Sequence, residues 1–196
     1  YTTLFRAISM RTICIVTATR AEYGLLRPVV QKLVASSTLQ LQLVATGAHL
    51  CPRLGETVRE IEADGVPIAA RLPIFVGDEN EPVAVTIART ITVFDAYFSA
   101  HRPDAVLLLG DRFEIFAAAT AAAARHIPIA HISGGDVTLG AADEYYRHCI
   151  TKMAAVHFPS CADSAARLVR MGEAPETVFC VGGLGDENIR TLPKMR

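Results

Sequence analysis

The sequence predicts an α/β fold: a doubly wound, mainly parallel sheet with helices on both faces. Short apolar runs alternate with segments whose apolar residues recur at helical spacing. Most of the strand-like runs carry several apolar residues in succession, which is typical of strands buried on both faces. Polar residues follow several of these runs directly, and doubly wound sheets bind ligands at that edge.

The first half of the chain is expected to alternate strands and helices. The run TICIVTA at 12–18 is continuous, with four apolar residues between its threonines, and predicts a buried strand. Residues 22–36 predict a helix, because one face collects their apolar side chains, namely Leu25, Leu26, Val29, Val30 and Leu33. A strand is expected at 39–47, a short helix at 54–63, and a third strand at 66–74.

The second half continues the alternation after a polar loop. Residues 83–100 have the apolar spacing of a long helix. An alanine-rich helix at 112–126 is expected between two strands, 104–110 and 127–133. The last expected elements are helices at 143–155 and 161–171 and strands at 154–160 and 177–182.

Length and composition indicate a single soluble domain. The chain has 196 residues, of which 51% are hydrophobic and 20% are charged, with a formal net charge of −1. This near-neutral charge gives no support for a nucleic-acid or polybasic membrane partner. We expect an extension or expression remnant at 1–9, a domain at 10–182, and the start of an interdomain linker at 183–196, with the next domain absent. The five cysteines show no CxxC spacing, which favours a reducing cytoplasm over a disulfide or zinc framework.

The segment TATRAEYG at 17–24 follows the first expected strand. It has no GxGxxG pattern, so a nicotinamide site of the usual kind is not expected. Arg20 at a helix start could pair with a phosphate, assisted by the helix N-terminal amides. The alternative is a threonine-capped helix with an exposed arginine.

The segment GDRFE places Asp111 directly after a strand and Glu114 three residues later. In one interpretation, Asp111 caps the next helix and Glu114 completes a capping box. In the other, Asp111 faces the ligand edge and transfers protons if its surroundings raise its pKa.

The loop HISGGDVTLGAADEYYRH at 131–148 is the richest in polar residues. Its glycine pair permits positive φ angles or close approach of the backbone to a ligand. Asp143 and Glu144 stand at the start of the next helix, and Arg147 and His148 follow about one turn later on the same face. A helix start with a local ion pair would explain single residues, but their density favours a catalytic loop.

The remaining histidines are weaker candidates. His49 follows a strand end and is either simply hydrogen-bonded or directly involved in chemistry. His157 is expected to be structural. No set of histidine, aspartate or glutamate residues has the spacing of metal ligands, so no metal is expected.

Four motifs carry a resemblance to a known family. TATRAEYGLLRPVV, TGAHL, LLLGDRFEIFAAATAA and IPIAHISGGDVTLGAADEYYRHCITKMA resemble, in this order, the N-terminal half of hydrolysing UDP-N-acetylglucosamine 2-epimerases of the sialic and legionaminic acid pathways. The resemblance implies one of two Rossmann-like domains in a glycosyltransferase-B arrangement, with the active site in the cleft between them. It implies a UDP-sugar substrate, no cofactor, and a homodimer or homotetramer in the full-length protein.

The implied reaction begins with elimination of UDP from UDP-N-acetylglucosamine, which gives a 2-acetamidoglucal. Water then adds to C1 with inversion at C2 and releases N-acetylmannosamine. The weakly acidic C2 proton needs a positioned base, and the departing UDP needs cations or acids near its phosphates.

The residue patterns and the resemblance together give the site candidates, and by matching motif the resemblance itself assigns roles to Arg20, His49, Asp111, Arg147 and His148. The catalytic candidates are Asp111, Asp136, Asp143, Glu144 and His148. The substrate-binding candidates are Arg20, Gly24, His49, Arg112, Ser133, Gly134, Gly135 and Arg147. Non-hydrolysing relatives have a glutamate where this sequence has Ser133, so Asp136, Asp143 or Glu144 would supply the missing charge. This difference leaves room for another substrate, such as a 4-amino-4,6-dideoxy sugar nucleotide.

Two other classes of function stay open. One is a non-hydrolysing UDP-sugar 2-epimerase, or a glycosyltransferase of the same architecture. The other is an inactive domain that only associates with a partner or with itself. Since the second domain of the cleft lies outside the chain, the chain by itself is expected to be inactive.

Overall fold

The structure is a computed structural model that describes residues 10–76, 81–140 and 142–186. The expected N-terminal extension at 1–9 lies outside these ranges, as does the expected linker from residue 187 onward.

Six strands form one sheet in which every pairing is parallel. The strands are β1 (Arg11–Thr17), β2 (Leu39–Thr46), β3 (Ile68–Leu72), β4 (Ala105–Leu109), β5 (Ile129–Ile132) and β6 (Val156–Phe158). Their order is β3-β2-β1-β4-β5-β6, which reverses direction between β1 and β4. The predicted doubly wound α/β fold is therefore confirmed, and ligands of such sheets bind where the order reverses.

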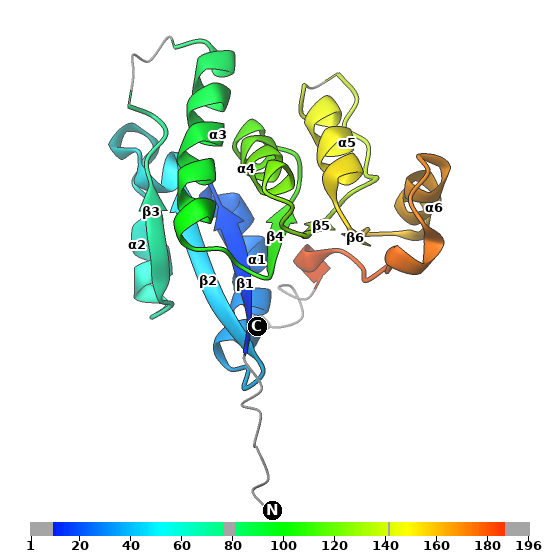
Figure 1. Cartoon of the computed structure of the whole chain (residues 1–196), viewed down its shortest axis with the longest axis horizontal. Helices are drawn as coiled ribbons and strands as arrows, with labels where there is room; N and C mark the ends of the chain where they lie inside the picture. The colour runs from blue at the N-terminus through cyan, green and yellow to red at the C-terminus, as the bar shows by residue number, and fades with distance from the viewer. Residues whose placement is uncertain (1–9, 77–80, 141, 187–196) are drawn as a thin grey trace, which may run out of the picture.

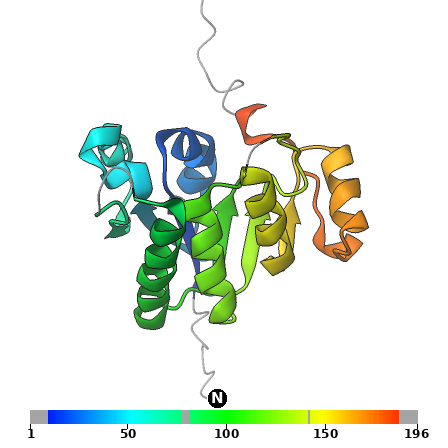
Figure 2. The same cartoon turned by 90° about the horizontal axis from the view of Figure 1, so that it is seen from above.

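Helices cover both faces of the sheet. They are α1 (Arg20–Val34), α2 (Val58–Ala63), α3 (Val83–Ala100), α4 (Phe113–Ala124), α5 (Asp143–Met153) and α6 (Ala162–Arg170), with short 3-10 turns at Gly47–Leu50, Pro52–Leu54 and Pro175–Thr177. Figure 2 shows α1 and α2 on one face, α3, α4 and α5 on the other, and α6 beside the β6 edge. Figure 1 shows the same layers with the sheet seen between them.

The core consists of two apolar layers, one on each side of the sheet. Phe94, Phe98 and Leu108 pack in the layer under α3, α4 and α5. Ile15 and Leu26 pack in the layer under α1 and α2. Helix α3 is, by length and composition, the one helix in the described ranges that could span a membrane, but its buried aromatic residues belong to this core.

The predicted strand at 177–182 is wrong. A 3-10 turn occupies Pro175–Thr177, and after it only Val178 forms an isolated parallel bridge, with His157. Strand β6 has only three residues, so it offers a short edge for pairing. Phe179 and Val181 are more than half exposed, so the segment lacks the burial that its apolar sequence suggested.

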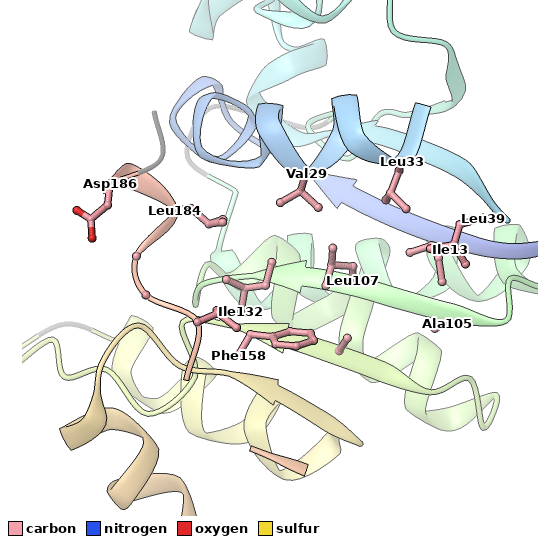
Figure 3. Close-up of a pocket in the computed structure, with 14 residues that line it drawn as sticks. Ile13, Val29, Leu33, Leu39, Ala105, Leu107, Ile132, Phe158, Leu184 and Asp186 are labelled. Carbon is pink, nitrogen blue, oxygen red and sulfur yellow. The ribbon is translucent and has the colours of Figure 1, made fainter. Parts of the chain in front are cut away.

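An apolar groove of about 820 Å³ lies on the α1 face of the sheet. Figure 3 shows Val29 and Leu33 of α1 on one side of it, with Leu107 and Ile132 of the sheet as its floor. Leu184 lies at its rim. Because its lining is mostly apolar, this groove is not suited to a phosphate-bearing ligand.

Candidate active site at the carboxyl edge of the sheet

Three polar segments meet at the carboxyl edge of the sheet. They follow the adjacent strands β1, β4 and β5, and parallel strands end at the same edge. Residues 17–22 start α1, residues 110–114 start α4, and residues 133–136 begin the loop that leads to α5. The edge thus brings together segments that are far apart in the sequence.

Arg147 of α5 ties the end of β4 to the loop after β5. Its guanidinium is buried and donates through Nη2 to the Asp111 carboxylate and, at 2.8 Å, to Thr138 Oγ1. Through Nη1 it contacts Glu144 Oε2 at 3.3 Å. Asp111 therefore does not cap α4: Arg112 occupies the cap position without a side-chain bond, and the expected capping box of Asp111 and Glu114 is wrong. The buried cation of Arg147 takes the carboxylate instead.

Glu144 connects Arg147 to a histidine. Its Oε1 accepts from His148 Nε2 at 3.1 Å, and its Oε2 accepts from the Thr138 amide at 2.7 Å. The predicted sharing of one helix face by an acid and a cation is confirmed for this part of α5. Asp143, at the first position of α5, is half-buried and acts electrostatically on Arg112. The result is a cluster of two carboxylates, a guanidinium and an imidazole.

The two glycines of the loop are needed for different reasons. Gly135 has a φ of 78°, and a Cβ there would overlap the carbonyl oxygen of Ser164. A Cβ on Gly134 would lie 3.0 Å from His131 Nδ1. Ser133 also has a positive φ, of 61°, and its amide donates to the Phe158 carbonyl. The expected positive φ is therefore present at Gly135, whereas the expected close approach of the backbone to a ligand stays a prediction.

Asp136 makes its hydrogen bonds near α6 and not at Arg147. It accepts from Ser160 Oγ at 2.7 Å and from Ser164 Oγ at 2.6 Å, both near the start of α6. These bonds attach the loop to α6, so Asp136 is not one of the carboxylates that pair with Arg147. Among the acids that the sequence offered as partners of Asp111, the structure brings only Glu144 to the same arginine.

The start of α1 has the conformation of a capped helix with an exposed arginine. Thr19 caps α1 and forms a capping box with Glu22. Arg20 is 73% exposed and pairs with Glu60 at 2.8 Å, so its phosphate role stays a prediction. Gly24 lies inside α1 and is half-buried.

His49 is fully buried and hydrogen-bonded to two threonines. Its Nε2 lies 3.0 Å from Thr17 Oγ1, and its Nδ1 lies 2.8 Å from Thr57 Oγ1. Burial lowers the pKa of His49 to about 4, so the ring is neutral at physiological pH. This geometry is that of a hydrogen-bonded structural histidine, and a direct role in chemistry stays a prediction.

A second charged cluster lies where the strand order reverses, and it joins Arg112 and Glu114 to Glu22, a residue that the sequence did not indicate as part of a site. Glu22 is 8% exposed and Glu114 is 0% exposed. Arg112 donates to Glu114 Oε1 at 2.8 Å. Burial raises the pKa of Glu22 to about 7, and the nearby charge of Glu114 adds to this effect. The pattern Thr-x-x-Glu at Thr19 could have revealed Glu22 as a capping residue, but no sequence signal indicated the burial of Glu114.

Within the ranges that the structure describes, no group of three or more histidine, cysteine, aspartate or glutamate residues is arranged to hold a metal ion. The charged groups at this edge instead pair with one another. A ligand here would meet carboxylates, an imidazole and the partly exposed side chain of Arg112.

Comparison with known proteins gives matches that span the chain. A family model described as UDP-N-acetylglucosamine 2-epimerase matches residues 31–195. The UDP-N,N'-diacetylbacillosamine 2-epimerase (hydrolyzing) of Legionella pneumophila is 41% identical over 92% of this chain and 48% of the relative. The GDP/UDP-N,N'-diacetylbacillosamine 2-epimerase (hydrolyzing) of Campylobacter jejuni is 38% identical over 94% of this chain and 48% of the relative. The chain thus spans about half the length of these curated relatives.

The fold also matches solved structures. The UDP-GlcNAc 2-epimerase of Neisseria meningitidis, solved with UDP-GlcNAc bound, superposes with a TM-score of 0.81 at 22% identity. The match covers 91% of this chain and 48% of that structure. At this level of identity the likeness shows a common fold. The chain corresponds to one half of the two-domain arrangement of such structures.

Proposed function

Because the chain belongs to the UDP-N-acetylglucosamine 2-epimerase family, we propose that it is the N-terminal half of a hydrolysing UDP-sugar 2-epimerase. The observation that carries the proposal is the cluster around Arg147, in which Asp111 and Glu144 share one buried guanidinium at the carboxyl edge of the sheet. We expect a cytoplasmic homo-oligomer in which this edge forms one wall of the substrate cleft.

The proposed reaction has two steps. A base removes the proton from C2 of the sugar, and the C2–H electron pair forms a C1=C2 double bond as the C1–O bond breaks. UDP departs with the electrons of that bond. Water then adds its oxygen to C1, and a proton returns to C2 on the opposite face. The products are UDP and the free 2-epimeric sugar.

Two of the clustered groups suit the proton transfers. Asp111 and Glu144 are carboxylates held in fixed orientations by Arg147, which spares the cost of ordering them during the reaction. His148 donates to Glu144 and adds an imidazole on the same face of the helix. Arg112 and Arg20 are the cations proposed to meet the phosphates of the departing UDP.

Two substrates are candidates. UDP-N-acetylglucosamine would yield N-acetylmannosamine. A UDP-linked N,N'-diacetylbacillosamine, which carries a second acetamido group, is favoured by the names of the two relatives, at 41% and 38% identity. Ser133, which replaces the glutamate of non-hydrolysing relatives, is the local difference that accompanies the hydrolysing proposal.

Product analysis of the natural polypeptide that contains this chain tests the proposal. Each UDP-sugar is incubated in deuterated water, and the products are separated and examined by NMR. Free sugar with deuterium at C2, together with UDP, is the expected result. An epimerised UDP-sugar would instead indicate a non-hydrolysing enzyme. Absence of both turnover and UDP binding would leave only the association role.

A further inference from the structure

Two buried glutamates and one arginine meet at the point where the strand order reverses. Glu22 lies in the first turn of α1, after β1, and Glu114 lies in the first turn of α4, after β4. Because β1 and β4 pair in parallel, both helices start at the same edge of the sheet. Arg112, at the residue before α4, interacts with both carboxylates.

Each of these three side chains has one buried polar atom without a hydrogen-bond partner among the described residues. The atoms are Glu22 Oε1, Glu114 Oε2 and Arg112 Nε. The second oxygen of Glu22 accepts from the amides of Ala18 and Thr19, each at 2.9 Å. The second oxygen of Glu114 accepts from Arg112. Buried polar atoms without partners are uncommon and call for an explanation, such as a proton on a carboxyl group or a ligand that binds there.

We propose that Glu22 and Glu114 are positioning residues for Arg112, and that Glu22 takes up a proton when a nucleoside diphosphate binds at Arg112. This inference rests on the proposed function, which places the nucleotide at this edge. The side chain of Arg112 is 41% exposed, so it can reach a ligand while Glu114 holds it from the buried side. A proton on Glu22 removes one of two carboxylate charges beside the guanidinium. The charge of Arg112 is then shared by Glu114 and the incoming phosphate.

The electrostatics of the cluster agree with this role. Burial raises the pKa of Glu22 to about 7, and Glu114 raises it while Arg112 and the amides of Ala18 and Thr19 lower it. Asp143, from α5, is a further negative charge that acts on Arg112. At pH 8 Glu22 is therefore mostly ionised in the free protein. A bound diphosphate adds negative charge nearby, raises the pKa further, and draws a proton from solvent.

Titration calorimetry with UDP at pH 8, in two buffers of different ionisation enthalpy, counts the protons taken up on binding. The natural polypeptide that contains this chain is expected to take up close to one proton. UDP itself exchanges few protons there, because its terminal phosphate has a pKa of about 6. Glu22→Gln mimics the protonated side chain, so at pH 8 it should lose the uptake and bind UDP roughly tenfold more tightly than the mostly ionised wild type.

Glu62→Gln is the matched control. Glu62 is an exposed carboxylate of α2 that pairs with Arg71, so this variant makes the same change of charge away from the cluster. It should retain both the affinity and the proton uptake of the wild type. Glu114→Gln, in contrast, should weaken UDP binding roughly tenfold, because Arg112 loses its ionic partner.

A second measurement needs no variant. Proton uptake on binding requires the UDP affinity of the wild type to fall between pH 7 and pH 9, by at most about tenfold per pH unit. If the wild type and Glu22→Gln bind UDP equally with the same proton count, or if the wild-type affinity is flat over this range, this inference is overturned and the proposed function stands. If the wild type binds no UDP, both are overturned.

Discussion

At the scale of single residues, the chemistry of the carboxyl edge depends on one buried guanidinium. Arg147 is 6% exposed and contacts Asp111, Glu144 and Thr138. A buried cation of this kind needs its carboxylates, since an unpaired buried charge is strongly destabilising. The same pairing fixes the direction in which the two acids point before any substrate arrives.

Asp111→Asn in the natural polypeptide is expected to lower release of free sugar at least about a hundredfold, because the amide cannot accept or deliver a proton. The fold should persist, since Glu144 still pairs with Arg147. A coupled assay for free sugar measures the loss, and a thermal melt checks the fold. Asp163→Asn, an exposed aspartate of α6, is the matched control and should be fully active. Wild-type activity in Asp111→Asn would remove Asp111 from the mechanism.

The stability of the fold is expected to fall when the pH drops from about 6.5 to about 4. Burial lowers the pKa of His49 and of His131 to about 4, whereas both rings have ordinary values in the unfolded chain. Protons then bind preferentially to the unfolded state across this window. Each pKa unit corresponds to about 1.4 kcal/mol. Urea unfolding at several pH values measures the trend, and His49→Gln should make it shallower. An equal slope in this variant would contradict the assignment.

Glu22 has the opposite effect on the pH dependence of the free energy of unfolding. Its pKa is raised in the folded state to about 7, so the folded protein binds the extra proton and loses stability as the pH rises from about 4.5 to 7. The histidine and glutamate effects partly cancel in the wild type. Glu22→Gln should therefore steepen the net gain in stability between pH 4.5 and 7, as followed by the same urea titrations. An unchanged pH profile would mean that Glu22 is ionised in the folded protein.

At the scale of elements, the loop after β5 is shaped by backbone packing against α6. Gly135 and Gly140 have similar φ angles, 78° and 81°, but different surroundings. A Cβ at Gly135 would overlap the Ser164 carbonyl, while a Cβ at Gly140 would have no described atom within 4 Å. Comparing substitutions at the two positions therefore separates the stability lost through a positive φ from the stability lost through steric overlap with α6.

Gly140→Ala is expected to cost about 1 kcal/mol of stability through its φ alone. Gly135→Ala adds the collision with α6 and should cost about 2 to 4 kcal/mol. It should also lower activity, because the loop carries Ser133 and leads to α5. Thermal or urea unfolding of both variants gives the comparison. Equal costs for the two variants would show that the loop moves away from α6 without penalty.

Element prediction succeeded where an apolar pattern was long and buried. Helix α3 begins and ends as the spacing predicted, at Val83–Ala100. The segment at 177–182 looked equally apolar, but it lies beside a three-residue strand and remains exposed. Periodicity reports the preference of a segment and does not report whether a neighbour exists for it to pair with.

At the scale of the whole molecule, the described edge is one wall of the proposed cleft. The chain covers about 48% of each of the two curated relatives described above. The groups that would meet the nucleotide from the other side are therefore expected in the second half of such proteins. The apolar groove of Figure 3 differs chemically from this charged edge, because the residues that line the groove are mostly aliphatic and aromatic.

The 196-residue chain on its own is expected to release no free sugar from either UDP-sugar. Fusing it to the second half of the Legionella pneumophila relative, at 41% identity over the matched region, should restore measurable turnover. The same fusion carrying Asp111→Asn is the control for activity that arises from the added half. Turnover by the chain alone would show that one wall of the cleft suffices.

The sequence by itself determined the doubly wound sheet, the order of its helices, and the polar segments at its edge, because periodicity and strand ends are local properties. The motifs also determined the family. Only the tertiary structure decided that Asp111 pairs with Arg147 and does not cap α4, and that Asp136 fastens the loop to α6. It alone brought Glu22 and Glu114 to one arginine. Asp111 and Arg147 are 36 positions apart, and Asp136 and Ser164 are 28 positions apart. The strength of such pairings depends on burial, which the sheet creates only when its strands assemble.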